Sequence, residues 1–286
     1  MNIFKYRSTA AALRDLKAGT LYFAKPEKLN DILEAKYDDA SHEDFAQVML
    51  QTFNEISLQR GETPLLFDQD AKEAAAAAYK SECQNRKHFI QQLGVFSAAQ
   101  RANHQAMWAY YADNNTGFCF ELELDADVFR QHQLWATDVQ YQAEARIHNS
   151  ADDWRKVFLK LAAANPSASL AELKELSLEE PIRREWGVLT ASRAVSIKHT
   201  DWAQESEIRL IAPKSGAIPI LANMLKRVHF ILADDKHYSN EQLKVIGFLR
   251  TNPDYSSVET ISWKFSHGDI TTVPTPIKFE AIRLPT

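Results

Sequence analysis

The sequence predicts an α+β protein with a mixed or antiparallel sheet as its core and helical insertions. Strand-like segments outnumber the strand–helix–strand crossovers that a doubly wound parallel sheet needs. Residues 118–124 alternate strictly, with aromatic and leucine side chains at every second position and a cysteine and two glutamates between them. Long amphipathic segments follow the first strands, and no shift in composition marks a domain boundary. We therefore expect one domain over residues 1–286, with helical insertions at about 41–93 and about 150–180.

The N-terminal segment predicts a strand, a short helix and a second strand in succession. Residues 2–7 form the first strand-like segment. Ser8 or Thr9 can cap a helix over residues 10–18, because a hydroxyl oxygen there accepts a hydrogen bond from a first-turn N–H. Gly19 suits the position after this helix, where the left-handed conformation is common. The second strand follows at once.

The rest of the chain alternates between segments with strand and helix periodicity. The remaining expected strands cover residues 20–24, 95–97, 118–124, 139–141, 188–192, 207–212, 228–232, 258–265 and 277–284. The remaining expected helices cover residues 41–60, 68–93, 103–112, 150–165, 169–178 and 240–249.

Composition excludes several classes of protein. The chain has 33 Lys and Arg against 38 Asp and Glu, a net charge of −5, and it contains no long basic block. This balance argues against broad electrostatic binding to a nucleic acid backbone. No apolar run approaches the roughly 20 residues of a membrane-spanning helix. With two cysteines and no secretory segment at the start, we expect a cytoplasmic protein that does not associate with membranes.

Two acids at alternate positions mark the segment 202–211. Glu205 and Glu207 precede an apolar run that predicts a strand, so period-two alternation would place both carboxylates on one side of the sheet. Like charges so close repel, and they need solvent, cationic neighbours or a chemical task. The plain alternative is a solvated strand face on which Glu207 pairs with Arg7 or Arg209.

Several blocks of residues along the chain together carry a resemblance to a known family. They are residues 5–8, 21–26, 30–31, 94–97, 107–112, 117–119 and 139–141, with Glu34, Trp202, Glu205, Glu207 and Arg209. These blocks resemble a bacterial family of unknown function, the domain of unknown function numbered 2971. One departure is Ile32, where the family usually has proline after Asn-Asp. The family name implies no activity.

The opening strand, short helix, glycine and second strand also resemble the entrance of the ADP-ribosyltransferase fold. In that superfamily an arginine, a serine or tyrosine on a middle strand, and a late glutamate surround NAD, and some branches carry a paired Glu-x-Glu. The order of Arg7, Ser97, Glu205 and Glu207 is similar here. This resemblance is an analogy between folds.

The ADP-ribosyltransferase resemblance implies a role for each of these residues. Glu207 would hold the ribose hydroxyls and stabilise the positive charge that develops when the nicotinamide–ribose bond breaks. Glu205 would orient or deprotonate an acceptor. Arg7 would bind a pyrophosphate or ribose oxygen, with Ser97 beside NAD. Aromatic rings that could stack on nicotinamide or adenine are Tyr22, Trp108 and Tyr110.

Our leading hypothesis is an NAD-using enzyme that transfers ADP-ribose to a protein or nucleic acid acceptor, or hydrolyses NAD, as a toxin or phage-defence effector. A second hypothesis is a metal-dependent nuclease, in which Glu207 would act with Asp31 or Glu34. A third is a non-catalytic module whose aromatic helix binds a nucleotide or a partner. The sequence has no HExxH or CxxC motif, so we expect no dedicated zinc site.

Overall fold

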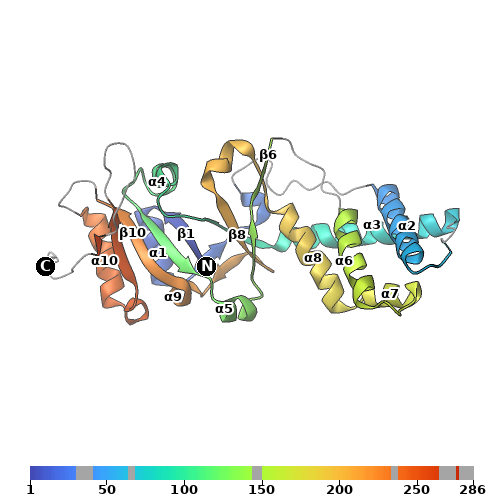
Figure 1. The fold of residues 1–286 in the computed structure, drawn as a ribbon. Coiled ribbons are helices and arrows are strands. Elements are labelled where there is room, and N and C mark those ends of the chain that lie inside the picture. Colours follow the sequence, from blue (N-terminus) through green and yellow to red (C-terminus); the bar gives the residue numbers. More distant parts are fainter. Residues whose placement is uncertain (30–40, 64–67, 144–149, 233–237, 264–274, 277–286) are drawn as a thin grey trace. The chain divides into compact units, whose positions relative to one another are not determined.

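The computed structural model describes residues 1–29, 41–63, 68–143, 150–232, 238–263 and 275–276 (Figure 1). The chain divides into two compact units. Unit 1 comprises residues 1–25, 93–141 and 200–286, and unit 2 comprises residues 26–92 and 142–199. Within the described ranges, no helix is both long enough and apolar enough to cross a bilayer.

Unit 1 is built on an eight-stranded mixed sheet, which confirms the predicted α+β class. The strand order is β12-β11-β10-β4-β1-β3-β8-β5, in which β10 and β11 run parallel and the other neighbours run antiparallel. The strands of this sheet are β1 (Asn2–Arg7), β3 (Gly94–Ala99), β4 (Phe118–Glu123), β5 (Trp135–Asp138), β8 (Glu207–Ala212), β10 (Leu225–Ile231), β11 (Glu259–Trp263) and β12 (Thr275–Pro276). Beside it, β2 (Leu21–Phe23) pairs with β9 (Gly216–Ile218).

The central strand β4 places its alternating residues in two different apolar clusters, as its sequence predicts. Phe118, Phe120 and Leu122 belong to the large cluster, whereas Cys119 belongs to the smaller one. The large cluster includes buried residues of α1 (Thr9–Ala18), α5 (Ala126–Gln131), α9 (Leu221–Met224) and α10 (Asn240–Thr251). The smaller cluster includes Met107 and Trp108 of α4 (Gln105–Tyr111). Apolar side chains therefore cover both faces of this strand.

The predicted start and end of α1 are confirmed. The Ser8 hydroxyl accepts a hydrogen bond from the Ala11 N–H at 3.2 Å, so Ser8 rather than Thr9 is the cap. Gly19 follows with φ of 64°, the left-handed conformation that a helix end favours. Ala12 and Leu16 turn one face of the helix into the large cluster. Capping and packing together fix α1 directly after β1.

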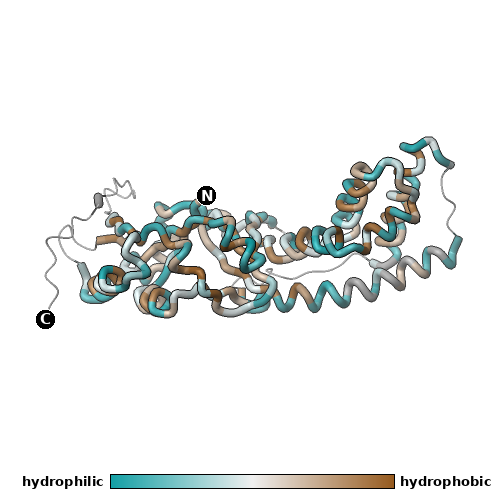
Figure 2. The backbone as a smooth tube through the Cα atoms, turned by 90° about the horizontal axis from the view of Figure 1, so that it is seen from below, coloured by the Kyte–Doolittle hydropathy of each residue, from teal (hydrophilic) through white to brown (hydrophobic). Residues whose placement is uncertain are grey.

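Unit 2 consists mainly of helices. They are η1 (Pro26–Lys28), α2 (His42–Gln59), α3 (Gln69–Gln92), α6 (Ser150–Ala164), α7 (Leu170–Ser177) and α8 (Glu180–Ala194). Figure 2 shows brown and teal alternating along α2 and α6, as expected of amphipathic helices. In the core the Phe45 and Tyr79 rings stack at 3.7 Å, and the Arg86 guanidinium lies 4.3 Å from the Trp186 ring. The ranges expected as helical insertions fall in this unit, and the single domain stays a prediction.

The observed strands differ from the expected ones in several places. The strand expected at 188–192 is wrong, because these residues lie in α8, whose buried Thr190, Ala191 and Ala194 follow helical spacing. The short strands β5, β7 (Ile197–His199) and β9 were not predicted. The strand expected at 139–141 is β6 (Gln140–Gln142). The strand expected at 277–284 lies outside the described residues.

The sheet is weakly joined at one place, between β1 and β3. β1 pairs with β4 along its whole length, from Asn2 opposite Glu123 to Arg7 opposite Phe118. Its pairing with β3 has a single position, Phe4 opposite Ala99. Beyond that position β1 and β3 no longer form a ladder. The Lys5 side chain lies where this ladder ends and bonds to the Ser97 carbonyl oxygen.

The turn between α4 and β4 brings the chain close to the end of β1. Asp113, Asn114 and Asn115 have positive φ of 46°, 49° and 72°, which Asp and Asn tolerate better than most residues. Gly117 follows, and a Cβ added there would lie 2.3 Å from the Arg7 carbonyl oxygen. No side chain fits at that distance, so this crossing requires glycine.

We expect the Gly117→Ala substitution to lower the free energy of unfolding by about 1–3 kcal/mol, because the added methyl overlaps backbone atoms that cannot move independently. The matched control is Gly187→Ala in α8, where an added Cβ meets no atom within 4 Å. This control should raise stability by about 0.5–1 kcal/mol, since alanine favours helix. Urea unfolding measures both. Wild-type stability of Gly117→Ala would contradict the close approach.

Candidate polar site at the β1–β3 junction

The Lys5 amine occupies the place where β1 and β3 stop pairing. Its Nζ donates a hydrogen bond to the Ser97 carbonyl oxygen, and so links the two strands through a side chain. The same Nζ lies 4.8 Å from the centre of the Phe96 ring, and the Arg7 guanidinium carbon lies 5.9 Å from it. Two cations of β1 therefore share one aromatic ring of β3. Both side chains are partly buried.

Each acid near this junction has a defined partner. Arg209 holds the Glu207 carboxylate through two contacts, Nε to Oε1 at 2.7 Å and Nη2 to Oε2 at 3.2 Å. The Tyr111 hydroxyl donates to Glu205 Oε1 at 2.7 Å. On α1, Asp15 Oδ2 lies 2.8 Å from Nε of Arg7. These fixed pairs orient the carboxylates.

Four charged groups act on Lys5. Burial of the amine, and after it the positive charge of Arg7, lower its pKa from 10.5 to about 7. The carboxylates of Glu207, Asp15 and Glu205 act in the opposite direction. At neutral pH the amine is therefore divided between its neutral and charged forms, which is unusual for lysine.

The structure corrects the expected geometry of the acid pair. β8 begins at Glu207, whereas Glu205 ends the 3-10 helix η2 (Thr200–Glu205). Ser206 between them has φ of 46°, a left-handed turn that breaks period-two alternation. In the plain alternative, the solvated face is wrong, because Glu205 is 5% exposed and Glu207 4%, whereas the pairing of Glu207 with Arg209 is confirmed. Glu205 at the end of η2 and Glu207 at the start of β8 both act on Lys5 through their charges.

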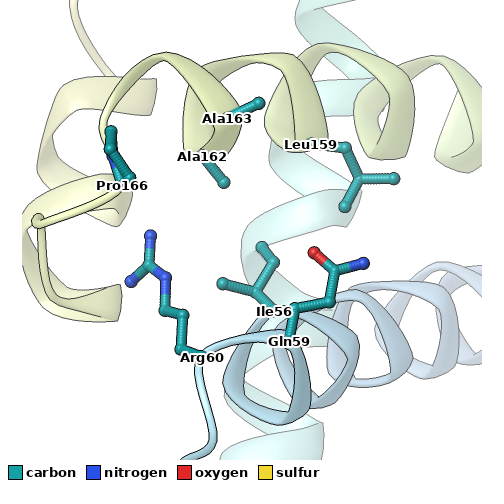
Figure 3. Close-up of a pocket in the computed structure, with 7 residues that line it drawn as sticks. All are labelled: Ile56, Gln59, Arg60, Leu159, Ala162, Ala163 and Pro166. Atoms are coloured by element: carbon teal, nitrogen blue, oxygen red, sulfur yellow. The ribbon is translucent and has the colours of Figure 1, made fainter.

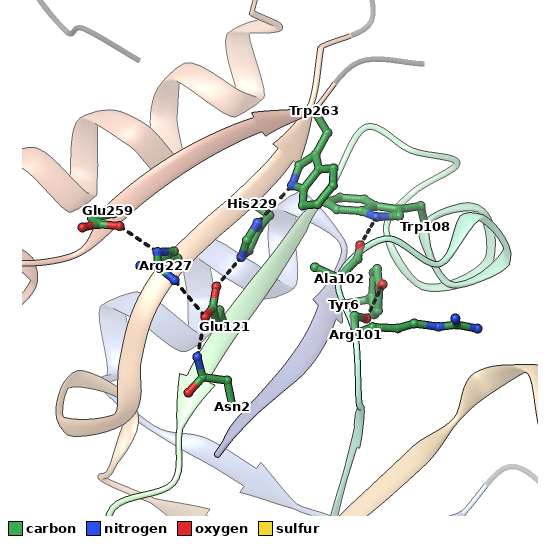
Figure 4. A network of polar contacts seen from close by, with 10 residues as sticks. All are labelled: Asn2, Tyr6, Arg101, Ala102, Trp108, Glu121, Arg227, His229, Glu259 and Trp263. Atoms are coloured by element: carbon green, nitrogen blue, oxygen red, sulfur yellow. Dashed lines mark hydrogen bonds and ion pairs between the residues drawn. The ribbon is translucent and has the colours of Figure 1, made fainter. Parts of the chain in front are cut away.

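The remaining predicted residues lie in different surroundings. Ser97 contributes its backbone carbonyl to Lys5 and lies opposite Arg209 in the register of β3 and β8. Trp108 is fully buried, donates from Nε1 to the Ala102 carbonyl at 2.7 Å and packs edge-on against Tyr6 (Figure 4). Tyr22 on β2 and Tyr110 on α4 are exposed. Asp31 and Glu34 lie outside the described residues.

Sequence reasoning did not identify Lys5, Asp15, Tyr111 and Tyr141 as members of this site. Two signals were present. Lys5 is two residues before Arg7 on a strand, so alternation places both on one side. Tyr111 is three residues after the buried Trp108, whereas Tyr110 is on another face of the helix. No local signal identified Asp15, or Tyr141, whose hydroxyl accepts from the Glu207 N–H at 2.8 Å.

A second polar group, around Glu121, lies across β4, β10 and β11 (Figure 4). Nε1 of Trp263 donates to Nδ1 of His229 at 2.9 Å, so Nδ1 carries no proton. His229 Nε2 therefore donates to Glu121 Oε2, also at 2.9 Å. Both imidazole nitrogens are used and the ring is buried, so His229 cannot serve as a general base here. This group joins strands, and it is structural.

An open pocket of about 220 Å³ lies between α2 and α6 in unit 2 (Figure 3). Arg60 reaches across it and donates to the carbonyl oxygens of Ala168 and Asn165. These bonds satisfy carbonyl groups after the end of α6, where helical partners are missing. The lining is otherwise mostly aliphatic, from residues such as Ile56 and Leu159. The arginine thus fixes a turn.

Comparison with known proteins gives one match. Residues 107–210 match the family model described as "Protein of unknown function (DUF2971)". The match confirms the resemblance for this part of the chain, which contains Glu205, Glu207 and Arg209 and excludes Lys5 and Arg7. No curated protein and no solved structure matches the chain. Among the described residues, no group of three or more His, Cys, Asp or Glu is placed to hold a metal ion.

The Glu121 group predicts a dependence of stability on pH. Burial alone would raise the pKa of Glu121, but its bond from His229 and the charge of Arg227 outweigh this and hold the pKa below 4.5. A lowered pKa stabilises the folded state above the unfolded value, and this contribution is lost as the pH falls through the folded value. We expect Glu121→Gln to lose roughly 1.5–3 kcal/mol at pH 7.

Urea unfolding at pH 7 and at steps below pH 4.5 measures the effect. The difference between wild type and Glu121→Gln should shrink as the pH falls, because the wild-type carboxylate then takes up a proton. The control is Glu123→Gln on the same strand, where Glu123 is half exposed and pairs with Lys226. It should change stability by less than about 1 kcal/mol. A difference for Glu121→Gln that is constant with pH would contradict the charged network.

Proposed function

We propose that the protein is an NAD-using enzyme similar to ADP-ribosyltransferases, which transfers ADP-ribose to a macromolecule or hydrolyses NAD. The observation that carries the proposal is that Arg7 packs on Phe96 beside Lys5, while the charges of Arg7, Glu205 and Glu207 all act on the Lys5 amine. These three residues come from β1, η2 and β8, far apart in the sequence. The sequence hypothesis asks for more, since it expects Arg7, Ser97 and Glu207 to converge at one ligand-sized cleft. A role as toxin or phage-defence effector belongs to the same proposal.

The carboxylates suit the cleavage of the nicotinamide–ribose bond. As that bond breaks, positive charge builds on the ribose, and a carboxylate held nearby stabilises the transition state more than the ground state. Arg209 fixes both oxygens of Glu207, and Tyr111 fixes one oxygen of Glu205. Such preorganised groups need no rearrangement when the charge develops. Glu207 would serve the ribose, with Glu205 beside the acceptor.

The cationic side of the junction suits the diphosphate of NAD. Arg7 is a planar donor group whose guanidinium matches the geometry of phosphate oxygens. Asp15 contacts its Nε, and the Phe96 ring lies beneath the guanidinium carbon. These contacts fix the arginine before a ligand arrives. Arg7 would thus face the anionic diphosphate of NAD, and the two glutamates would face the positive charge that develops on the ribose. All three residues belong to unit 1.

We expect Glu207→Gln to lower the rate of nicotinamide release from labelled NAD by about 10²–10³-fold, the usual cost of removing one preorganised transition-state contact. NAD affinity, measured by calorimetry, should change little. The matched control is Glu123→Gln, which changes a half-exposed glutamate of β4 and should retain the wild-type rate.

Because Glu207 is buried against Arg209, the glutamine variant needs a folding control. Glu207→Asp keeps the negative charge, and thermal melting of both variants shows whether they are folded. A wild-type protein that neither binds NAD nor releases nicotinamide would overturn the proposal. Equal release by wild type and a folded Glu207→Gln variant would also overturn it.

A further inference from the structure

Lys5 stands at the centre of the junction and has had no role so far. Its amine is partly buried, donates to the Ser97 carbonyl and lies over the Phe96 ring. Charged groups on four elements act on it: Arg7 on β1, Asp15 on α1, Glu205 on η2 and Glu207 on β8. A ligand that contacts these acids therefore comes close to this nitrogen.

The two acids are poorly suited to accept a proton. Both oxygens of Glu207 already accept from the Arg209 guanidinium, which favours the ionised carboxylate and weakens it as a base. Glu205 Oε1 is already occupied by the hydrogen bond from the Tyr111 hydroxyl. Their arrangement suits stabilisation of positive charge. Removal of the proton from the attacking acceptor then requires a different basic group close to Glu205 and Glu207.

We propose that Lys5 is the general base of this site. This proposal rests on the proposed function. The oxygen of water or of an acceptor hydroxyl bonds to the anomeric carbon of the ribose. The carbon–nitrogen bond to nicotinamide breaks, and its electron pair stays on the ring nitrogen, so nicotinamide leaves neutral. The proton of the attacking oxygen passes to the neutral amine of Lys5, which later releases it to solvent. Glu205 and Glu207 remain ionised throughout.

The protonation behaviour of Lys5 agrees with this role. A general base works best when its pKa is near the working pH. Burial and Arg7 bring the pKa of Lys5 to about 7 in spite of three acids nearby. Donation to Ser97 uses an N–H that both the neutral and the charged amine possess, so the side chain keeps its position through proton transfer.

The first experiment measures Lys5 without turnover. Lysine labelled with ¹³C at Cε during expression reports the titration of each unmodified amine by NMR, and the Lys5 signal is assigned by its absence in Lys5→Arg. We expect this signal to titrate near pH 7, and the exposed Lys226 of β10 provides the reference signal. Added NAD should shift the Lys5 signal and leave that of Lys226 unchanged. A Lys5 titration near pH 10 would overturn the inference.

The second experiment measures the pH profile of nicotinamide release. The wild-type kcat should rise with pH through about 7, as the amine loses its proton. Lys5→Arg keeps a cation and a donor but stays protonated, so kcat should fall by about 10²-fold or more and the rise should disappear. NAD affinity should stay within a few-fold, and Lys226→Arg should match wild type. A folded Lys5→Arg variant with the wild-type profile would overturn the role of Lys5.

The outcomes separate this inference from the proposed function. If NAD binds and is cleaved but the Lys5 signal does not move, the inference fails and the NAD-using enzyme stands. If calorimetry detects no NAD binding and no nicotinamide is released, the proposed function fails and the inference fails with it.

Discussion

The divergence of β1 from β3 is the constraint on which the candidate site depends. A fully formed ladder there would occupy the backbone groups of both strands, and the Ser97 carbonyl would bond to an N–H of β1. Because the two strands pair at one position, the side chain of Lys5 reaches that carbonyl instead. The opening admits Lys5 and Arg7 beside Phe96 and exposes them to the acids of α1, η2 and β8. Local loss of backbone pairing thus creates a polar site inside a sheet.

Two groups of charged residues in unit 1 show how similar side chains serve different ends. Around Glu121, bonds from His229, Arg227 and Asn2 join neighbouring strands, and the imidazole has no nitrogen left for chemistry. Around Lys5, charges of both signs surround an amine with a pKa near neutrality. The hydrogen bonds of the Glu121 group fit a single protonation state of its members. The second retains a group that can change its protonation state at neutral pH, which is why it is the better candidate for catalysis.

Much of the fold could be predicted from periodicity, capping and alternation. The alternation in β4, the Ser8 cap and the Gly19 end were visible because each depends on neighbours in the sequence. The expected geometry of the acid pair was wrong, since a left-handed Ser206 has no clear sequence signature. Lys5 was missed because its environment comes from tertiary packing. Burial against Phe96 and the field of Asp15 arise only when distant segments meet.

The two inserted segments of unit 2 have a consequence for how the chain folds. β1 and β3 flank the first insertion, so their meeting closes a loop that includes residues 26–92. The entropy of closing a loop grows only with the logarithm of its length, and each doubling costs about 0.6 kcal/mol. The insertion therefore costs little stability, but such distant contacts slow the search for the native topology. The junction that carries the candidate site should be among the late-forming parts of the sheet, after the helices have formed from local contacts.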